Sequence, residues 1–568
     1  MCRRWHNLLL AGALILSLLL APMVAQAQLE SLLLSAARSQ AAKDTGPKDW
    51  KMYKGNAGHT GFTGERISFP LKLIWKNTLE GTPDNPASPV VADGVLYVIT
   101  GGRLYALDAS SGTIKWRYPA AAPLDSALRT SPAVGDDLVY FGSASGKLYA
   151  VTKDKGQQAW TFAAKGAINS SPVVDAGTVY FGSDDNSLYA IDARTGGFKW
   201  GGAFRTQDDI SSPPSTGGGN VYFLSNDSNL YAASVADGSI MWTAKIGITR
   251  RNDTPLALGS TVYLASVNRI YAYRGLGGSI AWSCELPCDV ASIPAAGTDA
   301  LYFMSTDNQL YTIGLNGERK WNKPFNIGSP VTASPVIVND TVVIVGKNGL
   351  IIAIDAQTGE VKWKNTVAPA LPDPAKPETV DFSSSPAVSH GTLFAVADDG
   401  SVYAFRGDAG DSSAPQISPV WPKRSGIVPA APPMDIIATV VDPGAGIKPE
   451  SIAMTLDGNK VDFDQLPERG IIWYTLPADE NAKPLSDGLH TVTVTATDWM
   501  GNKAEQKWSF FADSRIQPAK ITPSAQGEET GIMPGMEAEM GIRAPAISGR
   551  RTRRAPQAAP VPAVPAFP

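Results

Sequence analysis

The chain has 568 residues, with 49 basic and 53 acidic side chains and a formal net charge of −4. One hydrophobic core cannot fill a chain of this length, so we expect several domains or a large repeat array with an appendage. The near-balance of charge argues against a basic surface for nucleic acid. Glycine (54) and proline (43) together make up roughly one residue in six, which favours a turn-rich, all-β protein.

The N-terminus has the pattern of a cleavable secretory signal. Arg3 and Arg4 precede an apolar run from Leu8 to Leu20, and Ala25-Gln26-Ala27 follows. An uncleaved membrane anchor is the alternative, but this run of about 13 residues is shorter than the about 20 that a spanning helix needs. We therefore expect a signal peptide at 1–27, a leader at 28–49, no membrane span, and a periplasmic or secreted product. No cysteine follows the apolar run where a lipid would be attached.

A unit that begins at a proline, in most copies as Ser-Pro, returns about every 41 residues. Its eight prolines are Pro89, Pro132, Pro172, Pro214, Pro255, Pro294, Pro335 and Pro386. A tryptophan follows each of the first seven prolines after 27 or 28 residues, at Trp116, Trp160, Trp200, Trp242, Trp282, Trp321 and Trp363. The eighth copy has no tryptophan at that place. Repeats of this length indicate one supersecondary unit per copy.

Within a copy, alternating apolar residues between glycine-bearing turns predict four short strands. Such a sheet cannot bury both faces alone, and radial stacking of the copies into an eight-bladed β-propeller over 50–407 solves this problem. Trp75 lies 14 residues before Pro89, as Trp200 lies 14 residues before Pro214. We therefore expect the N-terminal segment to supply the missing outer strand of the eighth blade. Trp421, 35 residues after Pro386, is the alternative.

The turns before the tryptophans are similar to one another, as in ALDASSGTIKW, AIDARTGGFKW and AIDAQTGEVKW. They resemble the tryptophan-docking repeat of the pyrroloquinoline quinone (PQQ) quinoprotein and PQQ-like propeller superfamily, and the resemblance covers roughly Trp50 to Gly407. This superfamily includes PQQ-dependent dehydrogenases and a cofactor-free propeller lipoprotein of the outer-membrane protein assembly machine. The resemblance therefore implies a fold but not a chemistry.

The dehydrogenases resembled here hold PQQ in a central channel with calcium, usually under a disulfide between adjacent cysteines. This sequence has no Cys-Cys pair and no CxxCH haem motif. We expect Cys284 and Cys288, in WSCELPCDV, to form a local structural disulfide rather than a redox pair or half of a metal site. His59, His390 and His490 lie far apart without a partner motif, so we expect no catalytic residue and no metal site.

The connections from each tryptophan strand to the next copy differ widely in sequence, and variable loops on a rigid frame favour a binding face. The candidate binding residues are Arg129, Arg205, Asp208, Asp209, Arg250, Arg251, Asp253, Asp381 and Phe382. The last connection carries four prolines between Pro369 and Pro377 and is expected to protrude as a stiff edge. Aspartates in the tight turns, such as Asp184 and Asp307, are expected to form turns rather than to bind calcium.

After a predicted linker at 408–433 the spacing of the apolar residues changes. Alternating segments over 434–513 predict a seven-stranded β-sandwich that resembles bacterial immunoglobulin-like modules. Calcium binding at Asp442 or Asp498 is an alternative to the turn-forming role that we favour for both. The Pro- and Ala-rich stretch 514–568, with GRRTRR at 549–554, is expected to be a disordered, solvated tail.

Two functions from different classes fit these patterns. The favoured one is an exported, non-enzymatic propeller scaffold without a cofactor, which binds an envelope protein or glycan and is similar to the propeller subunit of the outer-membrane assembly machine. The alternative is a divergent dehydrogenase that uses PQQ and Ca²⁺ to oxidise an alcohol or sugar.

Overall fold

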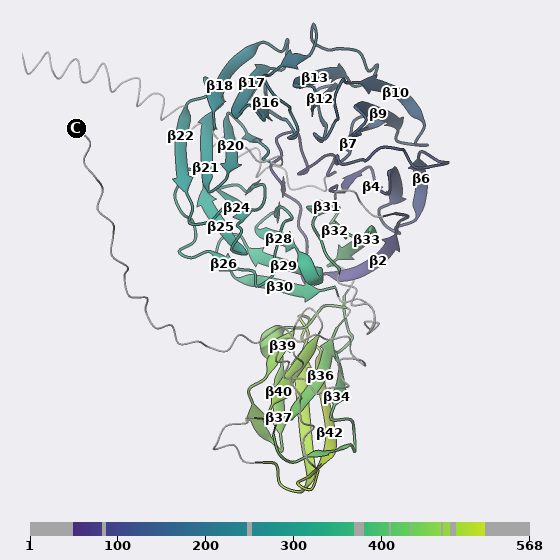
Figure 1. Ribbon diagram of the computed structural model, residues 1–568, viewed down its shortest axis with the longest axis vertical. Coiled ribbons are helices and arrows are strands. Elements are labelled where there is room, and N and C mark those ends of the chain that lie inside the picture. Colours follow the sequence, from purple (N-terminus) through teal and green to yellow (C-terminus); the bar gives the residue numbers. More distant parts are fainter. Residues whose placement is uncertain are drawn as a thin grey trace, which may run out of the picture.

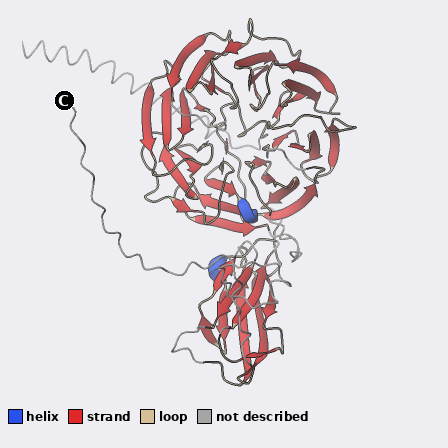
Figure 2. Ribbon diagram, in the orientation of Figure 1, coloured by secondary structure: helices blue, strands red, loops and turns tan. Residues whose placement is uncertain are grey.

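The structure is a computed structural model that describes residues 49–81, 87–246, 253–367, 380–407, 410–432, 434–442, 444–466, 470–476 and 484–516. The regular elements of these residues are strands, apart from two short 3₁₀ helices, η1 (Lys347–Gly349) and η2 (Pro449–Ser451). Sheets are arranged around a ring, and two more form a body beside it (Figures 1 and 2). The prediction of an all-β propeller is confirmed. The predicted signal peptide and nearly all of the predicted tail lie outside the described residues.

The ring is built from consecutive groups of strands, one group to each repeat copy. Ring sheet 1 contains β3 (Val90–Ala92), β4 (Val95–Thr100), β5 (Arg103–Asp108) and β6 (Ile114–Tyr118). Ring sheet 2 contains β7 (Ala133–Val134), β8 (Leu138–Gly142), β9 (Lys147–Thr152) and β10 (Gln158–Ala163). Ring sheet 3 contains β11 (Val173–Asp175), β12 (Thr178–Ser183), β13 (Ser187–Asp192) and β14 (Phe204–Arg205). Ring sheet 4 contains β15 (Ser215–Gly217), β16 (Asn220–Ser225), β17 (Asn229–Ser234) and β18 (Ile240–Lys245).

The second half of the ring continues the same order. Ring sheet 5 contains β19 (Leu256–Leu258), β20 (Thr261–Ser266), β21 (Arg269–Arg274) and β22 (Ile280–Glu285). Ring sheet 6 contains β23 (Ala295–Ala296), β24 (Ala300–Met304), β25 (Gln309–Gly314) and β26 (Phe325–Asn326). Ring sheet 7 contains β1 (Phe62–Thr63), β27 (Val336–Val338), β28 (Thr341–Val345), β29 (Leu350–Asp355) and β30 (Val361–Thr366). Ring sheet 8 contains β31 (Ala387–Ser389), β32 (Thr392–Val396), β33 (Ser401–Arg406) and β2 (Lys72–Thr78).

Two features of the sequence close this ring. Strand β2, which carries Trp75, pairs antiparallel with β33 and is the fourth strand of ring sheet 8. Where serine precedes the repeat proline in neighbouring copies, the backbone N–H of one serine donates to the hydroxyl of the next and joins the two sheets. The bond from Ser385 to Ser88, 3.1 Å long, connects ring sheet 8 to ring sheet 1. Trp421, the alternative for ring closure, lies on β34 outside the ring.

Each docked tryptophan packs on the glycine of a turn in the following ring sheet, which we call the docking turn. At Gly156 a Cβ atom would lie 2.3 Å from the ring of Trp116, and the φ angle there is +64°, so glycine is required on both grounds. The other pairs are Trp75–Gly112, Trp160–Gly196, Trp200–Gly238, Trp242–Gly278, Trp282–Gly317 and Trp321–Gly359.

The body beside the ring is a β-sandwich of nine described strands, where seven strands were expected. One sheet contains β34 (Gln416–Trp421), β36 (Asp435–Val441), β40 (Ile471–Thr475) and β39 (Asp464–Leu466). The other contains β35 (Ile427–Pro429), β42 (Lys503–Asp513), β41 (Gly488–Thr497), β37 (Ala453–Leu456) and β38 (Asn459–Val461). Strands β34 and β35 lie inside the predicted linker, so the sandwich begins earlier than expected. The immunoglobulin-like relationship stays a prediction. None of the described helices is long and apolar enough to cross a membrane.

The sandwich docks on the ring through an interaction that the ring also uses between its own sheets. Trp363 on β30 is fully buried, and its indole Nε1–H donates to Ala445 O at 2.7 Å. In the ring, Trp116 donates in the same way to Lys153 O of the next sheet at 2.9 Å. Trp499 of the sandwich donates to Lys364 O of β30 at 2.8 Å and packs on the ring core. A sandwich loop thus takes the place of a docking turn for Trp363.

Candidate binding face and central channel

Loops from different parts of each repeat meet on one face of the ring, which we call the loop face. The hairpin turn between the second and third strands donates a backbone N–H to the connection that precedes the same sheet. Examples are Asn226 N to Asp209 O at 2.9 Å and Asp398 N to Asp381 O at 2.8 Å. These bonds fix the connections against the rigid sheets, so their side chains have defined positions for recognition.

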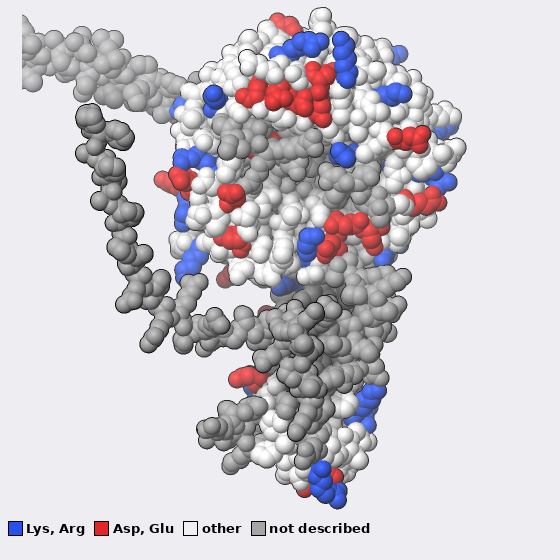
Figure 3. Space-filling view, viewed as in Figure 1, with Lys and Arg blue, Asp and Glu red and all other residues white. Residues whose placement is uncertain are grey.

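An acidic group lies on the loop face over ring sheets 3 and 4, where Figure 3 shows acidic side chains together. Its members are Asp184, Asp185, Asp208, Asp209 and Asp227. Asp185 accepts hydrogen bonds from Lys165 N at 2.9 Å and from the hydroxyl of Tyr189 at 2.6 Å. Burial, together with the adjacent carboxylate, raises the pKa of Tyr189 to about 12. Asp227 has equivalent partners in the next sheet. Part of this group therefore maintains the turns, as expected.

The predicted binding residues differ in exposure. Arg129, Arg205 and Asp208 are exposed, whereas Asp209 and Asp253 are partly buried. Neither arginine forms an ion pair with a residue that the structure describes. Arg250 and Arg251, and the proline-rich stretch between Pro369 and Pro377, lie outside the described residues.

Phe382 and Asp381 have structural roles, so their assignment to a binding surface needs correction. Phe382 is fully buried in the ring core, with its ring centroid 5.6 Å from that of Tyr403. Asp381 pairs with Lys347 at 3.1 Å and accepts the Asn348 N–H at 2.9 Å. An aromatic ring at the end of a loop can turn into the core while the neighbouring carboxylate holds the loop. The two residues together anchor this connection.

The predicted disulfide is absent, because Cys284 and Cys288 are both free thiols. Cys284 lies on β22 and packs against the core between ring sheets 5 and 6. Cys288 lies beyond the strand and donates to Asp307 Oδ2 at 3.4 Å. The two side chains therefore contact different neighbours. The hydrogen bond to Asp307, with burial, raises the pKa of the Cys288 thiol.

The segment from Trp50 to Glu65 runs along the inner strands at the centre of the ring. Its backbone carbonyls accept N–H groups from successive ring sheets, as in Val134 N to Lys51 O, Ala257 N to Gly58 O and Ile337 N to Gly61 O, all between 2.7 and 2.8 Å. Gly58 has no room for a Cβ, which would lie 2.3 Å from Ala257 O. This segment therefore connects the inner strands of several ring sheets to one another at the centre of the ring.

Two basic side chains of this segment are fully buried. The Lys54 ammonium has one hydrogen bond, to Pro335 O at 2.9 Å, and burial lowers its pKa to about 7. Neither ring nitrogen of His59 has a hydrogen-bond partner. Burial, with a smaller effect from Lys54, lowers the pKa of His59 to about 3, so the imidazole is neutral. The partly buried ring of Tyr53 packs edge-on against His59, with centroids 5.5 Å apart.

The residues at the centre of the ring do not fit PQQ with its calcium ion. Lys54 and His59 are buried there, and the carboxylate of Glu65 accepts the backbone N–H groups of His390 and Gly391 at 3.1 and 3.0 Å. In the part of the chain that the structure describes, three or more potential metal ligands lie together at one place, which is outside the ring. Among the described residues, no group of three acidic side chains lies in the channel, where the resemblance implies a calcium ion.

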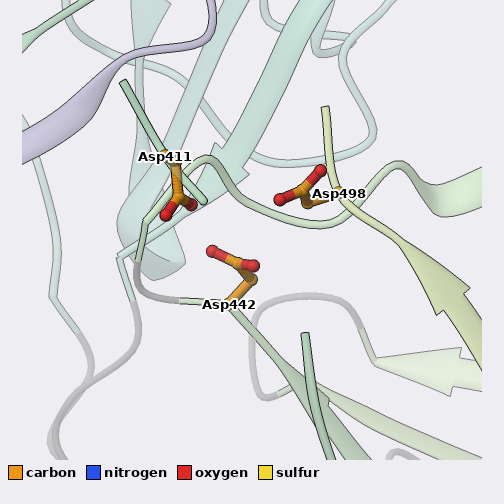
Figure 4. A group of neighbouring side chains, drawn as sticks. All are labelled: Asp411, Asp442 and Asp498. Carbon is orange, nitrogen blue, oxygen red and sulfur yellow. The ribbon is translucent and has the colours of Figure 1, made fainter. Parts of the chain in front are cut away.

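That one place is the group Asp411, Asp442 and Asp498, which we call the junction cluster (Figure 4). Of these three residues, the sequence raised calcium for Asp442 and Asp498, and Asp411 was missed because it lies in the predicted linker. The remaining histidines have structural partners. His390 contacts the hydroxyl of Ser389, and His490 contacts Asp457 and Ser486 O.

Comparisons with known proteins find relatives of both kinds. The sequence profile of the family described as "Outer membrane protein assembly factor BamB" matches residues 122–258 and 252–440, together more than half of the chain. The profile described as "Glucose/ethanol/alcohol dehydrogenase, beta-propeller domain" matches residues 70–169.

Two curated relatives and one solved structure illustrate the range. Outer membrane protein assembly factor BamB of Bordetella pertussis is 28% identical over 150 residues, or 26% of this chain and 37% of the relative. Quinoprotein alcohol dehydrogenase PedH of Pseudomonas putida is 33% identical over 100 residues, or 16% of this chain and 17% of the relative. The matches thus span well under half the length of these relatives.

The solved structure of quinohemoprotein alcohol dehydrogenase from Comamonas testosteroni has a TM-score of 0.51 at 14% identity, covering 67% of this chain and 86% of that one. At this identity the likeness shows the fold alone. With the ring, its docked tryptophans and the profile match over more than half of the sequence, the chain belongs to the PQQ-like β-propeller family described by outer membrane protein assembly factor BamB.

Proposed function

We propose that this protein is an exported, non-enzymatic scaffold whose propeller binds an envelope protein or glycan through the loop face. The main support is the centre of the ring, where the segment from Trp50 to Glu65 is hydrogen-bonded to the inner strands and buries Lys54 and His59. This segment lies at the centre of the ring, where the dehydrogenases that the sequence resembles hold their cofactor. The predicted secretory signal and the envelope function in the name of the BamB relative support the location.

Arg129 and Arg205 are the side chains best suited to test the loop face. Both are exposed. Arg129 lies in the connection from ring sheet 1 to ring sheet 2, and Arg205 ends β14, just before the connection that carries Asp208 and Asp209. Charged side chains at the rim of an interface direct partner choice and association. Lys155 and Arg194 are matched controls, because these exposed cations lie in the turns between third and fourth strands, on the opposite side of ring sheets 2 and 3.

The experiment begins with crosslinking in the native envelope and mass spectrometry of the captured partner. Partner capture and thermal unfolding are then measured for Arg129→Glu/Arg205→Glu and for Lys155→Glu/Arg194→Glu. We expect the first pair to reduce capture at least tenfold with an almost unchanged melting temperature, because exposed substitutions usually change stability by about 0.5 kcal/mol or less. Loss of capture only in the control pair would place the binding surface on the other face.

The dehydrogenase alternative is supported by the profile match at residues 70–169 and by the quinoprotein relatives. It predicts that purified protein given PQQ and Ca²⁺ develops quinone absorbance and reduces a dye with an alcohol or sugar. We expect neither signal. Dye reduction that depends on all three additions would contradict the scaffold proposal.

A further inference from the structure

The junction cluster joins three chain segments at the contact between ring and sandwich. Asp411 precedes β34, Asp442 follows β36, and Asp498 follows β41. The sandwich loops that carry Asp442 and Asp498 are the loops that dock on β30 through Ala445 and Trp499. Figure 4 shows the three carboxylates directed toward a common point.

The geometry of the oxygens fits one cation. One carboxylate oxygen from each residue lies within 4.8 Å of the other two. Calcium binds oxygen ligands at about 2.4 Å, so two ligands of the same ion can be up to about 4.8 Å apart. All three residues are buried, with exposed fractions of 8% for Asp411, 7% for Asp442 and 1% for Asp498.

One carboxylate oxygen in the cluster lacks a partner. Asp442 Oδ1 accepts the N–H groups of Gly444 at 2.7 Å and Gly446 at 3.3 Å. Asp442 Oδ2 is buried and has no hydrogen-bond donor. A buried charged oxygen without a partner carries a desolvation penalty that proteins normally avoid. This oxygen needs a ligand.

The cluster has little balancing charge, since Lys72 acts on Asp411 without forming an ion pair with it. No lysine or arginine within the described ranges forms an ion pair with any of its three carboxylates. Burial, and then the charges of Asp411 and Asp498, raises the pKa of Asp442. Three like charges held together in a buried site are stabilised by a bound cation far more than by solvent, which cannot reach Asp442 Oδ2.

We propose that Asp411, Asp442 and Asp498 bind one Ca²⁺ ion that fixes the sandwich on the propeller. The ligand set consists of hard oxygens without histidine or cysteine, which selects calcium or magnesium over zinc and copper. Calcium is favoured because three ligands from three loops make an irregular site, whereas Mg²⁺ demands near-octahedral geometry and retains its water.

The site is coupled directly to the docking of the two bodies. Asp411 Oδ2 accepts the Ala445 N–H at 2.7 Å, and Ala445 O accepts the indole N–H of Trp363. Asp498 is followed by Trp499, which contacts β30. An ion held by Asp411, Asp442 and Asp498 therefore orders both loops that contact the ring. This role is independent of the loop face and of the proposed function.

The test is calorimetric titration of CaCl₂ into the chelator-treated full chain, with MgCl₂ in a parallel titration. We expect one Ca²⁺ per chain, weaker binding of Mg²⁺, and a melting temperature several degrees higher in Ca²⁺ than in chelator, since a ligand of the folded state stabilises it. Asp442→Asn should weaken Ca²⁺ binding at least tenfold. Asp464→Asn, which removes an exposed charge from β39 of the same sandwich, should leave it unchanged.

Terbium luminescence gives a second readout that needs no cluster variant. Tb³⁺ takes oxygen ligands like those of Ca²⁺, so excitation of Trp499 should produce terbium emission. CaCl₂ should abolish this emission by displacing Tb³⁺, and Trp499→Phe should reduce it severalfold.

In chelator, Asp442→Asn should unfold at or above the wild-type temperature, because one repelling charge is gone. Absence of Ca²⁺ binding by the wild type, or equal binding by Asp442→Asn, would overturn the proposal.

Discussion

Lys54 is fully buried, whereas lysine side chains in proteins are usually exposed to solvent. Its ammonium is enclosed at the centre of the ring with a single carbonyl partner, Pro335 O. The fully buried His59 beside it stays neutral because burial and the Lys54 charge oppose protonation. Both side chains belong to the segment that is hydrogen-bonded along the inner strands, so their burial is part of how the centre of the ring is packed.

The lowered pKa of Lys54 predicts a specific dependence of stability on pH. The folded chain releases the Lys54 proton near pH 7, whereas the unfolded chain keeps it to about pH 10.5. The unfolded state therefore binds more protons in this window, and the free energy of unfolding should rise with pH by up to about 1.4 kcal/mol per unit. Below pH 7 both states are protonated and the dependence disappears.

Denaturant unfolding between pH 7.5 and 9.5 tests this expectation on Lys54→Met, which keeps the length of the side chain without its charge. In this variant the free energy of unfolding should rise less steeply with pH than in the wild type, because the contribution of Lys54 is missing. Lys51→Met, at a lysine whose side chain is 45% exposed, should retain the wild-type slope. Parallel curves for wild type and Lys54→Met would mean that Lys54 titrates normally in the folded protein.

At the scale of elements, the regularity of the repeats made the ring predictable. The spacing of prolines and tryptophans placed the strands, and Trp75 indicated β2 as the outer strand paired with β33. The start of the sandwich was missed because Pro419 interrupts β34 and Pro429 ends β35, and proline in a short segment argues against a strand. No sequence pattern indicated that Phe382 turns into the core.

The junction cluster was only partly accessible from the sequence, since its members meet only after folding. Asp442 and Asp498 come together because they follow β36 and β41, and Asp411 joins them because the start of β34 pairs with the end of β36. The contact of Trp363 with Ala445 spans 82 residues and replaces a docking turn, which no local pattern announces. Long-range contacts between different bodies are the part that the repeat pattern does not encode.

Ring closure by β2 makes a prediction at this scale. Trp75 packs on Gly112 of ring sheet 1 and donates to Ala109 O at 3.1 Å, so it joins the last sheet to the first. Trp75→Ala should lower the free energy of unfolding by about 3 kcal/mol. This is the low end for such a truncation, because the indole side chain of Trp75 is partly exposed. Hydrogen–deuterium exchange of β33 should accelerate, since its pairing with β2 is weakened. Trp421→Ala, in the sandwich core, should leave exchange of β33 unchanged, and equal effects of both variants would contradict closure by β2.

For the whole molecule, two indole hydrogen bonds contribute to the placement of the sandwich, from Trp363 to Ala445 O and from Trp499 to Lys364 O. At a net contribution of about 1 kcal/mol for each, loss of both should lower the ratio of docked to released sandwich roughly 30-fold. Trp363→Phe/Trp499→Phe removes both donors and keeps aromatic packing, so the ring should remain folded while the sandwich is released. Small-angle scattering in chelator, where no cation bridges the junction cluster, should show a larger radius of gyration for the double variant than for the wild type.

Trp116→Phe is the control, because it removes the equivalent bond inside the ring, to Lys153 O. It should lower the melting temperature without changing the scattering curve. Identical scattering from the double variant and the wild type would show that the remaining contacts, such as Gly446 against Asn365, suffice to hold the two bodies together.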